Sequence, residues 1–203
     1  MPVYQLKNIA DHINTGVWKI TESSKELADQ LIKKGYPLTN MPDSKNENRL
    51  KQWLATRLLL NEFFNNVTIA YNEFGKPFLS NDKHISISHS NDLVAIIINE
   101  NSPCGIDIEK ISDKVERIKH KFLNPLDIEN VTSIEELTLY WGAKEALYKY
   151  YGQKKVLFIE HLFIDNYSKK STSFAGKIDM TDFKIELPMM YENIDDYILV
   201  HTL

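Results

Sequence analysis

Hydrophobic residues follow helical spacing in some segments of the chain and form short apolar runs in others. In residues 47–64, ENRLKQWLATRLLLNEFF, the spacing predicts a helix with one apolar stripe. The stripe consists of Leu50, Trp53, Leu54 and Leu58. Residues 24–35 have the same spacing, a serine N-cap and a stop at Gly35. We therefore expect the first third, to about Asn66, to be mainly helical.

Short apolar runs bounded by turn residues come next, and they predict strands. They cover residues 67–71, 84–88, 93–99 and 104–109. Helical spacing returns in residues 113–122 and 134–151. The tail is again strand-like, at residues 157–165, 173–180, 183–189 and 195–203.

The order of helix and then strands occurs twice, and a short repeat accompanies it. The pattern W-x-A-x-charged-x-L begins at Trp53 and again at Trp141, 88 residues later. Coincidence alone can explain so short a match, but the repeated order of elements favours a true internal repeat. We predict an α+β fold of two similar halves, residues 1–104 and 105–203, each a long helix packed on a small antiparallel sheet. The halves meet face to face, and the cleft between them is a usual place for a ligand.

Composition indicates an ordinary globular chain. Of its 203 residues, 43% are hydrophobic and 26% are charged, which is enough apolar material for one sizeable core or two small ones. No segment approaches the roughly 18 to 20 unbroken apolar residues of a membrane helix. The N-terminus lacks the basic-then-apolar layout of a signal peptide. We expect a cytoplasmic protein that does not bind membranes.

Net charge and cysteine content narrow the function classes. A formal charge of −4 gives no general attraction to nucleic acid, so we expect no nucleic-acid partner. The single cysteine, Cys104, makes neither an internal disulfide nor a zinc cluster. A catalytic metal would be held by oxygen ligands or histidines.

Two carboxylates share one side of the predicted strand at residues 104–109. Ile106 and Ile108 alternate with Asp107 and Glu109, so the two acids point to the same face. Acids about 7 Å apart along a strand repel each other and gain from a divalent cation beside them. An edge strand with a solvated acidic side explains the same alternation, and this motif alone does not decide between the two.

A second group lies on the predicted helix at residues 134–151. Trp141, Glu145 and Lys149 recur every four residues on one face. An exposed ion pair, worth only about 0.3–0.5 kcal/mol, accounts for Glu145 and Lys149. However, the helix is apolar on so much of its circumference that we expect packing on both sides, where a charged pair needs a functional partner. Glu145 would then add a third oxygen ligand, and Lys149 would be placed for a phosphate.

Polar residues suited to anions precede these groups. Gly75-Lys76-Pro77 forms a turn and Ser88-His89-Ser90 ends a strand, and their side chains donate hydrogen bonds to anionic oxygens. An ordinary turn and a structural histidine explain these motifs as well. The chain contains neither G-x-x-x-x-G-K-[ST] nor G-x-G-x-x-G. A phosphate site would therefore use side chains and a metal.

The order and spacing of four motifs resemble those of the 4'-phosphopantetheinyl transferases. The motifs are G-K-P at 75–77, I-S-H-S at 87–90, G-I-D-I-E at 105–109 and W-x-x-K-E-A-x-x-K at 141–149. The chain length resembles the monomeric surfactin-synthetase-activating type, which implies a pseudo-dimer with its active site in the cleft between the halves. Outside residues 75–149 the likeness is thin.

The resemblance implies a role for each matching residue. Asp107, Glu109 and Glu145 resemble ligands of Mg²⁺, which would also grip the pyrophosphate of coenzyme A. Glu145 would double as the base, Lys149 resembles the lysine that contacts the pyrophosphate, and Lys144 would assist. The residues that resemble the nucleotide-binding part are Lys76, Pro77, Ser88, His89 and Ser90, joined more loosely by Arg49 and Arg57.

The implied reaction is attack by a carrier-protein serine on the β-phosphate of coenzyme A. It releases 3',5'-adenosine diphosphate and leaves the phosphopantetheine arm on the serine. Either Glu145 directly or Glu109 through a water would take the serine proton, and the sequence leaves both open. The expected partners are coenzyme A and an apo acyl or peptidyl carrier protein, bound by a monomer. Carrier proteins commonly present an acidic helix, so we expect a basic patch near the cleft, and its candidate residues are Lys114, Arg117, Lys119 and Lys121. A solvated helix face explains this run of charges equally well.

Two other functions compete with this one. A divalent-metal phosphatase or nuclease would use the same carboxylates, but it often needs a second metal and the sequence offers one compact three-acid set. Release of inorganic phosphate from simple esters would favour it. A non-catalytic module that binds coenzyme A or a carrier protein would not need the metal set, and nucleotide binding without magnesium dependence would favour that module.

Overall fold

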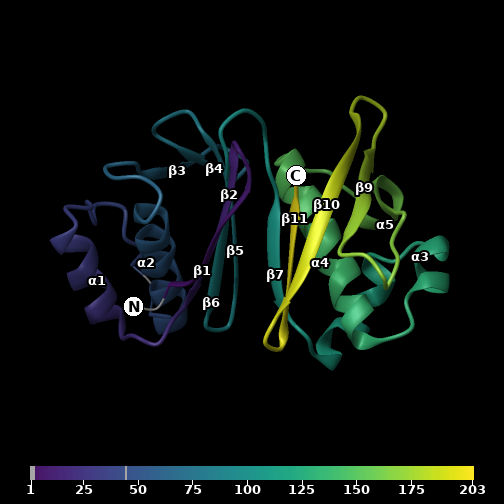
Figure 1. Cartoon of the computed structure of the whole chain (residues 1–203), viewed down its shortest axis with the longest axis horizontal. Helices are drawn as coiled ribbons and strands as arrows, with labels where there is room; N and C mark the ends of the chain where they lie inside the picture. The colour runs from purple at the N-terminus through teal and green to yellow at the C-terminus, as the bar shows by residue number, and fades with distance from the viewer. Residues whose placement is uncertain (1–2, 44) are drawn as a thin grey trace.

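Two antiparallel sheets pack face to face, and helices cover the outer side of each (Figure 1). The structure is a computed structural model that describes residues 3–43 and 45–203. The layers run helix, sheet, sheet, helix, with an apolar core in each of the three spaces between them. The predicted α+β class is confirmed.

The first sheet and its helices come from the N-terminal part of the chain. Its strands are β1 (Val3–Ala10), β2 (Ile13–Lys19), β5 (His84–Ser90) and β6 (Leu93–Asn99), in the order β1-β2-β6-β5. The helices on its outer face are α1 (Ser24–Lys33) and α2 (Glu47–Asn61). A separate hairpin pairs β3 (Ile69–Tyr71) with β4 (Pro77–Leu79).

The second sheet has five strands. They are β7 (Ile106–Lys110), β8 (Leu162–Asp165), β9 (Ser173–Asp179), β10 (Lys184–Ile194) and β11 (Tyr197–Thr202), in the order β7-β11-β10-β9-β8. The helices on its outer face are α4 (Ile134–Tyr151), the 3-10 helix η1 (Asp113–Lys121), α3 (Pro125–Asn130) and α5 (Phe158–His161). Among the helices described, none is both long and apolar enough to cross a membrane.

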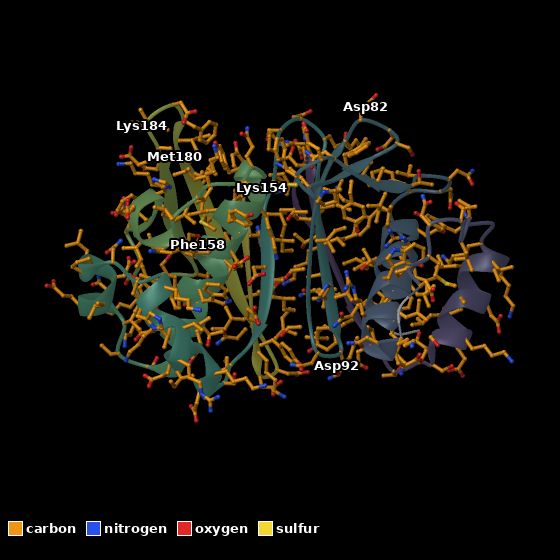
Figure 2. The ribbon with its side chains drawn as sticks, turned by 180° about the vertical axis from the view of Figure 1, so that it is seen from behind. Asp82, Asp92, Lys154, Phe158, Met180 and Lys184 are labelled. Carbon is orange, nitrogen blue, oxygen red and sulfur yellow. The ribbon has the colours of Figure 1, made fainter. Side chains whose placement is uncertain are left out.

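The core between the sheets explains why strand β6 is apolar from Leu93 to Ile98. Side chains alternate along a strand, so β6 contributes to two cores. Leu93, Ala95 and Ile97 enter the core between the sheets, together with Cys104. The intervening residues, Val94, Ile96 and Ile98, pack under the helices of the first sheet. The view from behind shows side chains in the space between the two sheets (Figure 2).

Both long covering helices begin at a side-chain cap. In α2 the side chain of Asn46 accepts the N–H of Arg49, and in α4 the side chain of Ser133 accepts the N–H of Glu136. Helix α4 ends at Gly152, whose left-handed φ of 68° suits glycine. The helices predicted from residues 47 and 134 are confirmed. The repeated tryptophan motifs lie on them, and the kinship of the two halves stays a prediction.

Edge strands β5 and β7 lie beside each other where the two sheets meet. Ser86, Ser88 and Ser90 occupy alternate positions of β5 and share one face. The hydroxyls of Ser86 and Ser90 accept the N–H groups of Ile106 (3.2 Å) and Lys110 (3.3 Å). Side chains of the first sheet thus satisfy the exposed backbone edge of the second, which fixes β7 in place.

Several predictions of local structure are wrong. The first third is not mainly helical, because residues 3–10 and 13–19 are strands. Pairing of β2 with β1 and β6 outweighs its weak local pattern. In the tail, residues 158–161 form a helical turn before strand β8, where a continuous strand was expected. Strand β4 and helix α3 were not predicted.

Candidate active site

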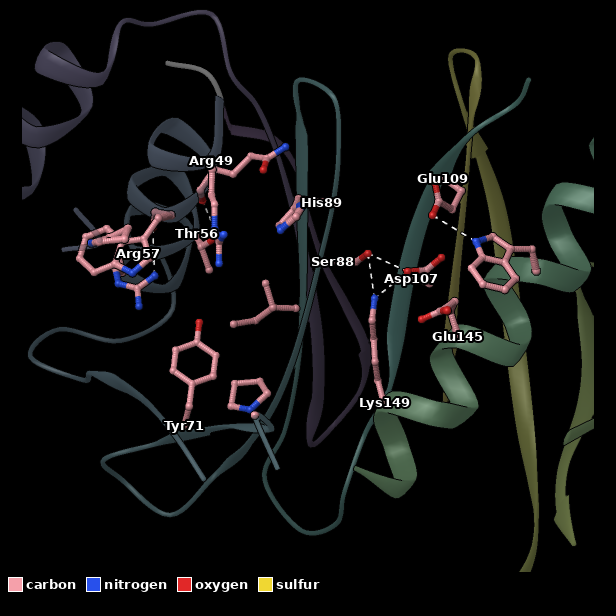
Figure 3. Close-up of a pocket in the computed structure, with 17 residues that line it drawn as sticks. Arg49, Thr56, Arg57, Tyr71, Ser88, His89, Asp107, Glu109, Glu145 and Lys149 are labelled. Carbon is pink, nitrogen blue, oxygen red and sulfur yellow. Dashed lines mark hydrogen bonds and ion pairs between the residues drawn. The ribbon is translucent and has the colours of Figure 1, made fainter. Parts of the chain in front are cut away.

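A cavity of about 630 Å³ opens where β5 and β7 meet, between α2 and α4. Figure 3 shows carboxylates on one wall and arginines on the other. The predicted site residues that line it are Arg49, Arg57, Pro77, Ser88, His89, Asp107, Glu109, Glu145 and Lys149. We call the side formed by β7 and α4 the acid wall and the side formed by α2 the arginine wall.

Asp107 is the most buried carboxylate of the acid wall, with 3% of its surface exposed. The alternation of β7 sends Ile106 and Ile108 into the core between the sheets and leaves Asp107 facing the cavity, as predicted. Oδ1 of Asp107 accepts hydrogen bonds from Lys149 Nζ (2.6 Å) and Ser88 Oγ (2.8 Å). Its Oδ2 is buried without a hydrogen-bond partner among the described residues. Such an oxygen is costly to bury, so a cation or hydrogen-bond donor beside it would stabilise the site.

Two further carboxylates stand beside Asp107. Glu109 accepts hydrogen bonds from Trp141 Nε1 (3.2 Å) and Ser90 Oγ (3.3 Å), while burial and the charge of Asp107 raise its pKa. The carboxylate of Glu145 makes no hydrogen bond to the described residues, and burial together with the charge of Asp107 raises its pKa to about 7. Three carboxylates crowded in a poorly solvated space favour a bound cation.

Helix α4 presents its site residues on successive turns. Trp141, Glu145 and Lys149 all line the cavity, so the face predicted from the four-residue spacing is confirmed. The indole of Trp141 packs between the rings of Phe122 (5.1 Å between centroids) and Phe158 (5.6 Å). This packing holds the indole N–H on Glu109 and orients that carboxylate.

The arginine wall carries positive charge that no acid among residues 3–43 and 45–203 pairs with. Arg57 is 3% exposed, its guanidinium lies 3.5 Å from the ring centroid of Trp53, and it donates to the carbonyl oxygen of Trp53 at 3.1 Å. Burial lowers its pKa, and no carboxylate of the described residues pairs with it. Arg49 lines the same wall two turns earlier. A buried cation without a counter-ion, beside a cavity, favours an anionic ligand.

Ser88 and His89 separate the two walls. Neighbouring residues of a strand point in opposite directions, so Ser88 turns to Asp107 and His89 turns to α2 (Figure 3). Burial lowers the pKa of His89, so its imidazole is neutral at pH 7 and donates from one nitrogen.

Three residues named from the sequence lie outside the cavity lining. The ammonium of Lys76 donates to the carbonyl oxygen of Tyr150 at 2.6 Å. Ser90 reaches the site only through its hydrogen bond to Glu109. Lys144 is fully buried and paired with Asp127 at 2.5 Å, so its interaction supports the fold and the expected assisting role is wrong.

The other lining residues were given no role of their own in the site, although Gly75, Ile87 and Trp141 belong to motifs noted in the sequence. They are Pro42, Gln52, Trp53, Thr56, Tyr71, Gly75, Ile87 and Trp141. Gln52, Trp53 and Thr56 lie three, four and seven positions after Arg49, so the helical spacing of α2 carried a usable signal. Nothing in the sequence marks Pro42 or Tyr71 as site residues, because a loop brings Pro42 to the cavity and the end of the short strand β3 brings Tyr71.

The described residues do not form a closed metal centre. No three of their His, Cys, Asp or Glu side chains are arranged to hold one ion. The unpartnered Oδ2 of Asp107 and the raised pKa values of Glu109 and Glu145 nevertheless fit a hard cation. Mg²⁺ commonly keeps several waters and binds substrate phosphates, so it does not require a cage of protein ligands. The predicted ligand set stays a prediction that these residues fit.

The acid wall lies in a segment that other proteins share. Residues 103–199 match the 4'-phosphopantetheinyl transferase superfamily. The resemblance predicted from the four motifs is confirmed for this segment. The chain is also similar to the 4'-phosphopantetheinyl transferase gsp of Aneurinibacillus migulanus, with 35% identity over 109 residues. That alignment covers 49% of this chain and 44% of the relative, so the chain spans less than half of the relative's length.

The superfamily match bears on one wall of the cavity. Its segment holds the acid wall, with Asp107, Glu109, Trp141, Glu145 and Lys149. The arginine wall and strand β5 lie before residue 103, outside the matched segment. The cavity places them in the site, because the matched segment and the N-terminal part line it together.

Proposed function

We propose that this protein transfers the phosphopantetheine arm of coenzyme A to a serine of an acyl or peptidyl carrier protein and releases 3',5'-adenosine diphosphate. The observation that carries the proposal is one cavity with three carboxylates and a lysine on one wall and two arginines on the other. Coenzyme A has a diphosphate and a separate 3'-phosphate, which call for two separate cationic groups. The superfamily match over the acid wall supports the same activity.

In this proposal Asp107, Glu109 and Glu145 hold Mg²⁺. The bound ion would offset negative charge on the diphosphate. The ammonium of Lys149, whose side chain is 26% exposed, donates to the diphosphate and offsets the charge that develops on the leaving side. Ser88 keeps Lys149 and Asp107 in position through hydrogen bonds to both.

The arginine wall binds the nucleotide part of coenzyme A. Arg49 and Arg57 contact the 3'-phosphate, and the neutral His89 donates one hydrogen bond beside them. Pro77 supplies an apolar contact at the hairpin. The side chains of Lys76 and Ser90 have partners elsewhere, so their geometry does not support the predicted direct contact with the nucleotide.

Glu145 is the base that removes the serine proton. Both oxygens of Glu109 already accept hydrogen bonds, one from Trp141 and one from Ser90, whereas the described residues leave the Glu145 carboxylate without a donor. A bound cation would lower the Glu145 pKa from about 7 and keep its carboxylate deprotonated, so that it can accept the serine proton. Glu109 acting through a water is the alternative left by the sequence.

The carrier protein docks on η1 and α3. Lys114, Arg117, Lys119 and Lys121 are all exposed on η1 and would attract an acidic helix. Leu126 and Ile128 of α3 are also largely exposed, and they would add apolar contact.

The proposal also covers the internal symmetry of the chain, its oligomeric state and its location. Residues 1–104 and 105–203 are related halves of a pseudo-dimer, supported by one helix-covered antiparallel sheet in each. The chain acts as a monomer, since both walls of the cavity come from one chain. The reaction takes place in the cytoplasm, where coenzyme A and carrier proteins are available.

A mass-shift assay tests the function. The protein is incubated with Mg²⁺, coenzyme A and several apo carrier proteins, and we expect the mass of one phosphopantetheine arm on one of them. Asp107→Ala should abolish the transfer and keep the far-UV circular dichroism of the parent. If Asp107→Ala loads a carrier at the parent rate, the assignment of the acid wall is wrong. Release of inorganic phosphate from simple esters, with no loading, would replace the proposal by a phosphatase.

A further inference from the structure

Lys76 lies in the tight turn that joins β3 to β4. The side chain of Asn72 accepts the N–H groups of Phe74 (3.0 Å) and Lys76 (2.9 Å), and Gly75 takes a left-handed φ of 85°. The turn therefore has a defined shape of its own. The side chain of Lys76 leaves the turn and reaches α4.

The ammonium of Lys76 caps the C-terminal end of α4. It donates to the carbonyl oxygen of Tyr150 at 2.6 Å, and no carboxylate of the described residues pairs with it. Carbonyl groups at a helix C-terminus carry partial negative charge and lack partners in the helix, so a cation is stabilised there. Burial lowers the pKa of Lys76, which shows that the contact is poorly solvated.

Gly152 leaves the space that this side chain fills. A Cβ on Gly152 would lie 2.2 Å from Cδ of Lys76 and 2.9 Å from both Cε and Nζ. The end of α4 is thus shaped around the stem of a lysine from the other side of the molecule.

The contact between Lys76 and Tyr150, which we call the tether, joins the β3–β4 hairpin to α4, and both border one end of the cavity. Tyr71, Gly75 and Pro77 line the cavity from the hairpin, and Glu145 and Lys149 line it from α4. A second cavity of about 100 Å³ lies on the other side of the turn, between the hairpin and α4. The hairpin is therefore a thin partition whose distance from α4 depends on what joins them.

We propose that Lys76 is a positioning residue that ties the β3–β4 hairpin to the C-terminus of α4 and thereby sets the width of the cavity and its affinity for coenzyme A. The choice of coenzyme A as the ligand rests on the proposed function. The contact of Lys76 with α4 does not depend on that function. Lys76 touches no reacting atom, so its loss should change binding more than the chemical step.

The first test compares Lys76→Met with Lys154→Met. Methionine keeps an apolar stem and removes the ammonium, and Lys154 is an exposed lysine just beyond the end of α4 (Figure 2). We expect KM for coenzyme A to rise about tenfold in Lys76→Met, the effect of one lost charge-assisted hydrogen bond, with kcat within about twofold of the parent. Lys154→Met should match the parent. Equal KM values in the two variants would overturn the inference.

The second test uses Gly152→Ala, which displaces Lys76 without altering a residue of the main cavity. KM for coenzyme A should rise in Gly152→Ala as in Lys76→Ala, and the double variant should show no further rise, because both changes break one tether. Multiplication of the two effects would contradict the inference. Lower thermal stability with unchanged KM in both single variants would reduce Lys76 to a structural role.

Amide hydrogen exchange separates failure of the tether from failure of the function. In Lys76→Met the amides of Phe74 and Lys76 should exchange faster than in the parent, whatever the ligand is. Unchanged exchange overturns the tether even if the parent transfers the arm. A parent that neither binds coenzyme A nor loads a carrier, with faster exchange in the variant, overturns the proposed function alone.

Discussion

Lys149 balances the charge of the acid wall. Its ammonium donates to Oδ1 of Asp107, to the hydroxyl of Ser88 (3.0 Å) and to the carbonyl oxygen of Ile106 (3.1 Å). An ammonium has three N–H groups, so a diphosphate that enters the cavity must take over one of these contacts. If the ammonium turns from the carboxylates to the diphosphate, another cation must balance the negative charge of the carboxylates.

Replacement of this lysine should separate metal binding from turnover. We expect Lys149→Ala to lower kcat about 100-fold, because one cation beside the developing charge is lost. Mg²⁺ should still stabilise the variant, since the three carboxylates remain. Steady-state kinetics and a magnesium titration followed by thermal unfolding measure the two effects, with Lys154→Ala as the charge-matched control. Unchanged kinetics would remove Lys149 from the mechanism.

Single residues were predicted well where a regular period carried them. The alternation of β7 placed Asp107 and Glu109 on the side away from the core, and the helical period placed Glu145 and Lys149 on one face. The same period puts Lys144 about 140° around the helix from Lys149, but it does not show what that other face contacts. Lys144 is buried with Asp127, and that pairing depends on how α3 folds back on α4.

At the scale of elements, Gly105, directly before β7, lies very close to the backbone of α4. A Cβ on Gly105 would lie 1.9 Å from the carbonyl oxygen of Ala146 and 3.1 Å from the amide nitrogen of Tyr150. These atoms belong to the helix backbone and cannot move aside as a flexible side chain can. The absence of a side chain here lets the strand that carries the acids lie against the helix that carries the lysine.

A methyl group at this position should force the two elements apart. Gly105→Ala should lower the free energy of unfolding by about 3 kcal/mol, because overpacking against backbone cannot relax easily. Gly35→Ala is the control: its Cβ would meet nothing within 4 Å, so its positive φ alone should cost about 1 kcal/mol. Urea unfolding measures both. A smaller loss for Gly105→Ala than for Gly35→Ala would contradict the close approach.

The start of α4 should make stability sensitive to acid. Burial would raise the pKa of Glu136, but hydrogen bonds from Lys169 and Thr132 outweigh it and lower that pKa to about 2. A depressed carboxyl pKa stabilises the fold above the unfolded value of 4.5, and this contribution is lost as pH falls toward 2.

Removal of this carboxylate should therefore lower stability above about pH 4.5 and have less effect as pH falls toward 2. Glu136→Gln should lower the free energy of unfolding by about 1–2 kcal/mol at pH 7, with allowance for the exposure of Lys169. The difference from the parent should vanish near pH 2. Urea unfolding at several pH values measures it, and a constant difference at every pH would show that the charge of Glu136 is not the cause.

Elements were predicted where caps and periods agreed and missed where pairing decided. The boundaries of α4 follow from its period, with a serine cap before it and a glycine after it. Strand β1 is largely exposed and β2 contains Asn14, Thr15 and Gly16, so neither has a clear strand pattern. Their structure comes from pairing: β2 forms a ladder with β6, which is distant in sequence, and β1 pairs with β2.

At the scale of the whole molecule, the core between the sheets joins the two parts of the chain. Strands β2 and β6 supply one side of it, and β7, β10 and β11 supply the other. Neither side is covered by its own helices, because those lie on the outer faces. Each part alone would leave an apolar sheet face in water.

Separate expression of residues 1–104 and 105–203 tests this dependence. Each piece should bind an apolar dye and lack a cooperative unfolding transition, and an equimolar mixture should regain one. Circular dichroism during a urea titration measures the transition. A monomeric piece that unfolds cooperatively by itself would show that the outer cores suffice.

The repeat along the chain predicted the face-to-face arrangement of the sheets. It did not predict the hydrogen bonds at the seam, where β5 and β7 lie beside each other. Two helix-then-strand blocks predict two covered sheets, whose remaining faces can be buried only against each other. The hydrogen bonds of Ser86 and Ser90 to the backbone of β7 join residues 20 positions apart on two edge strands. Such contacts depend on the final register of both sheets, and no local period encodes them.

The thiol of Cys104 is a natural probe of that seam. It lies in the apolar layer between the sheets with its sulfur 3.7 Å from the carbonyl oxygen of Ile97, and burial raises its pKa to about 12. Almost none of it is thiolate at neutral pH, so alkylating reagents should pass it by while the sheets stay together. Its rate of alkylation would report how often the two sheets separate. A cysteine added on the surface could be labelled with a dye without labelling Cys104.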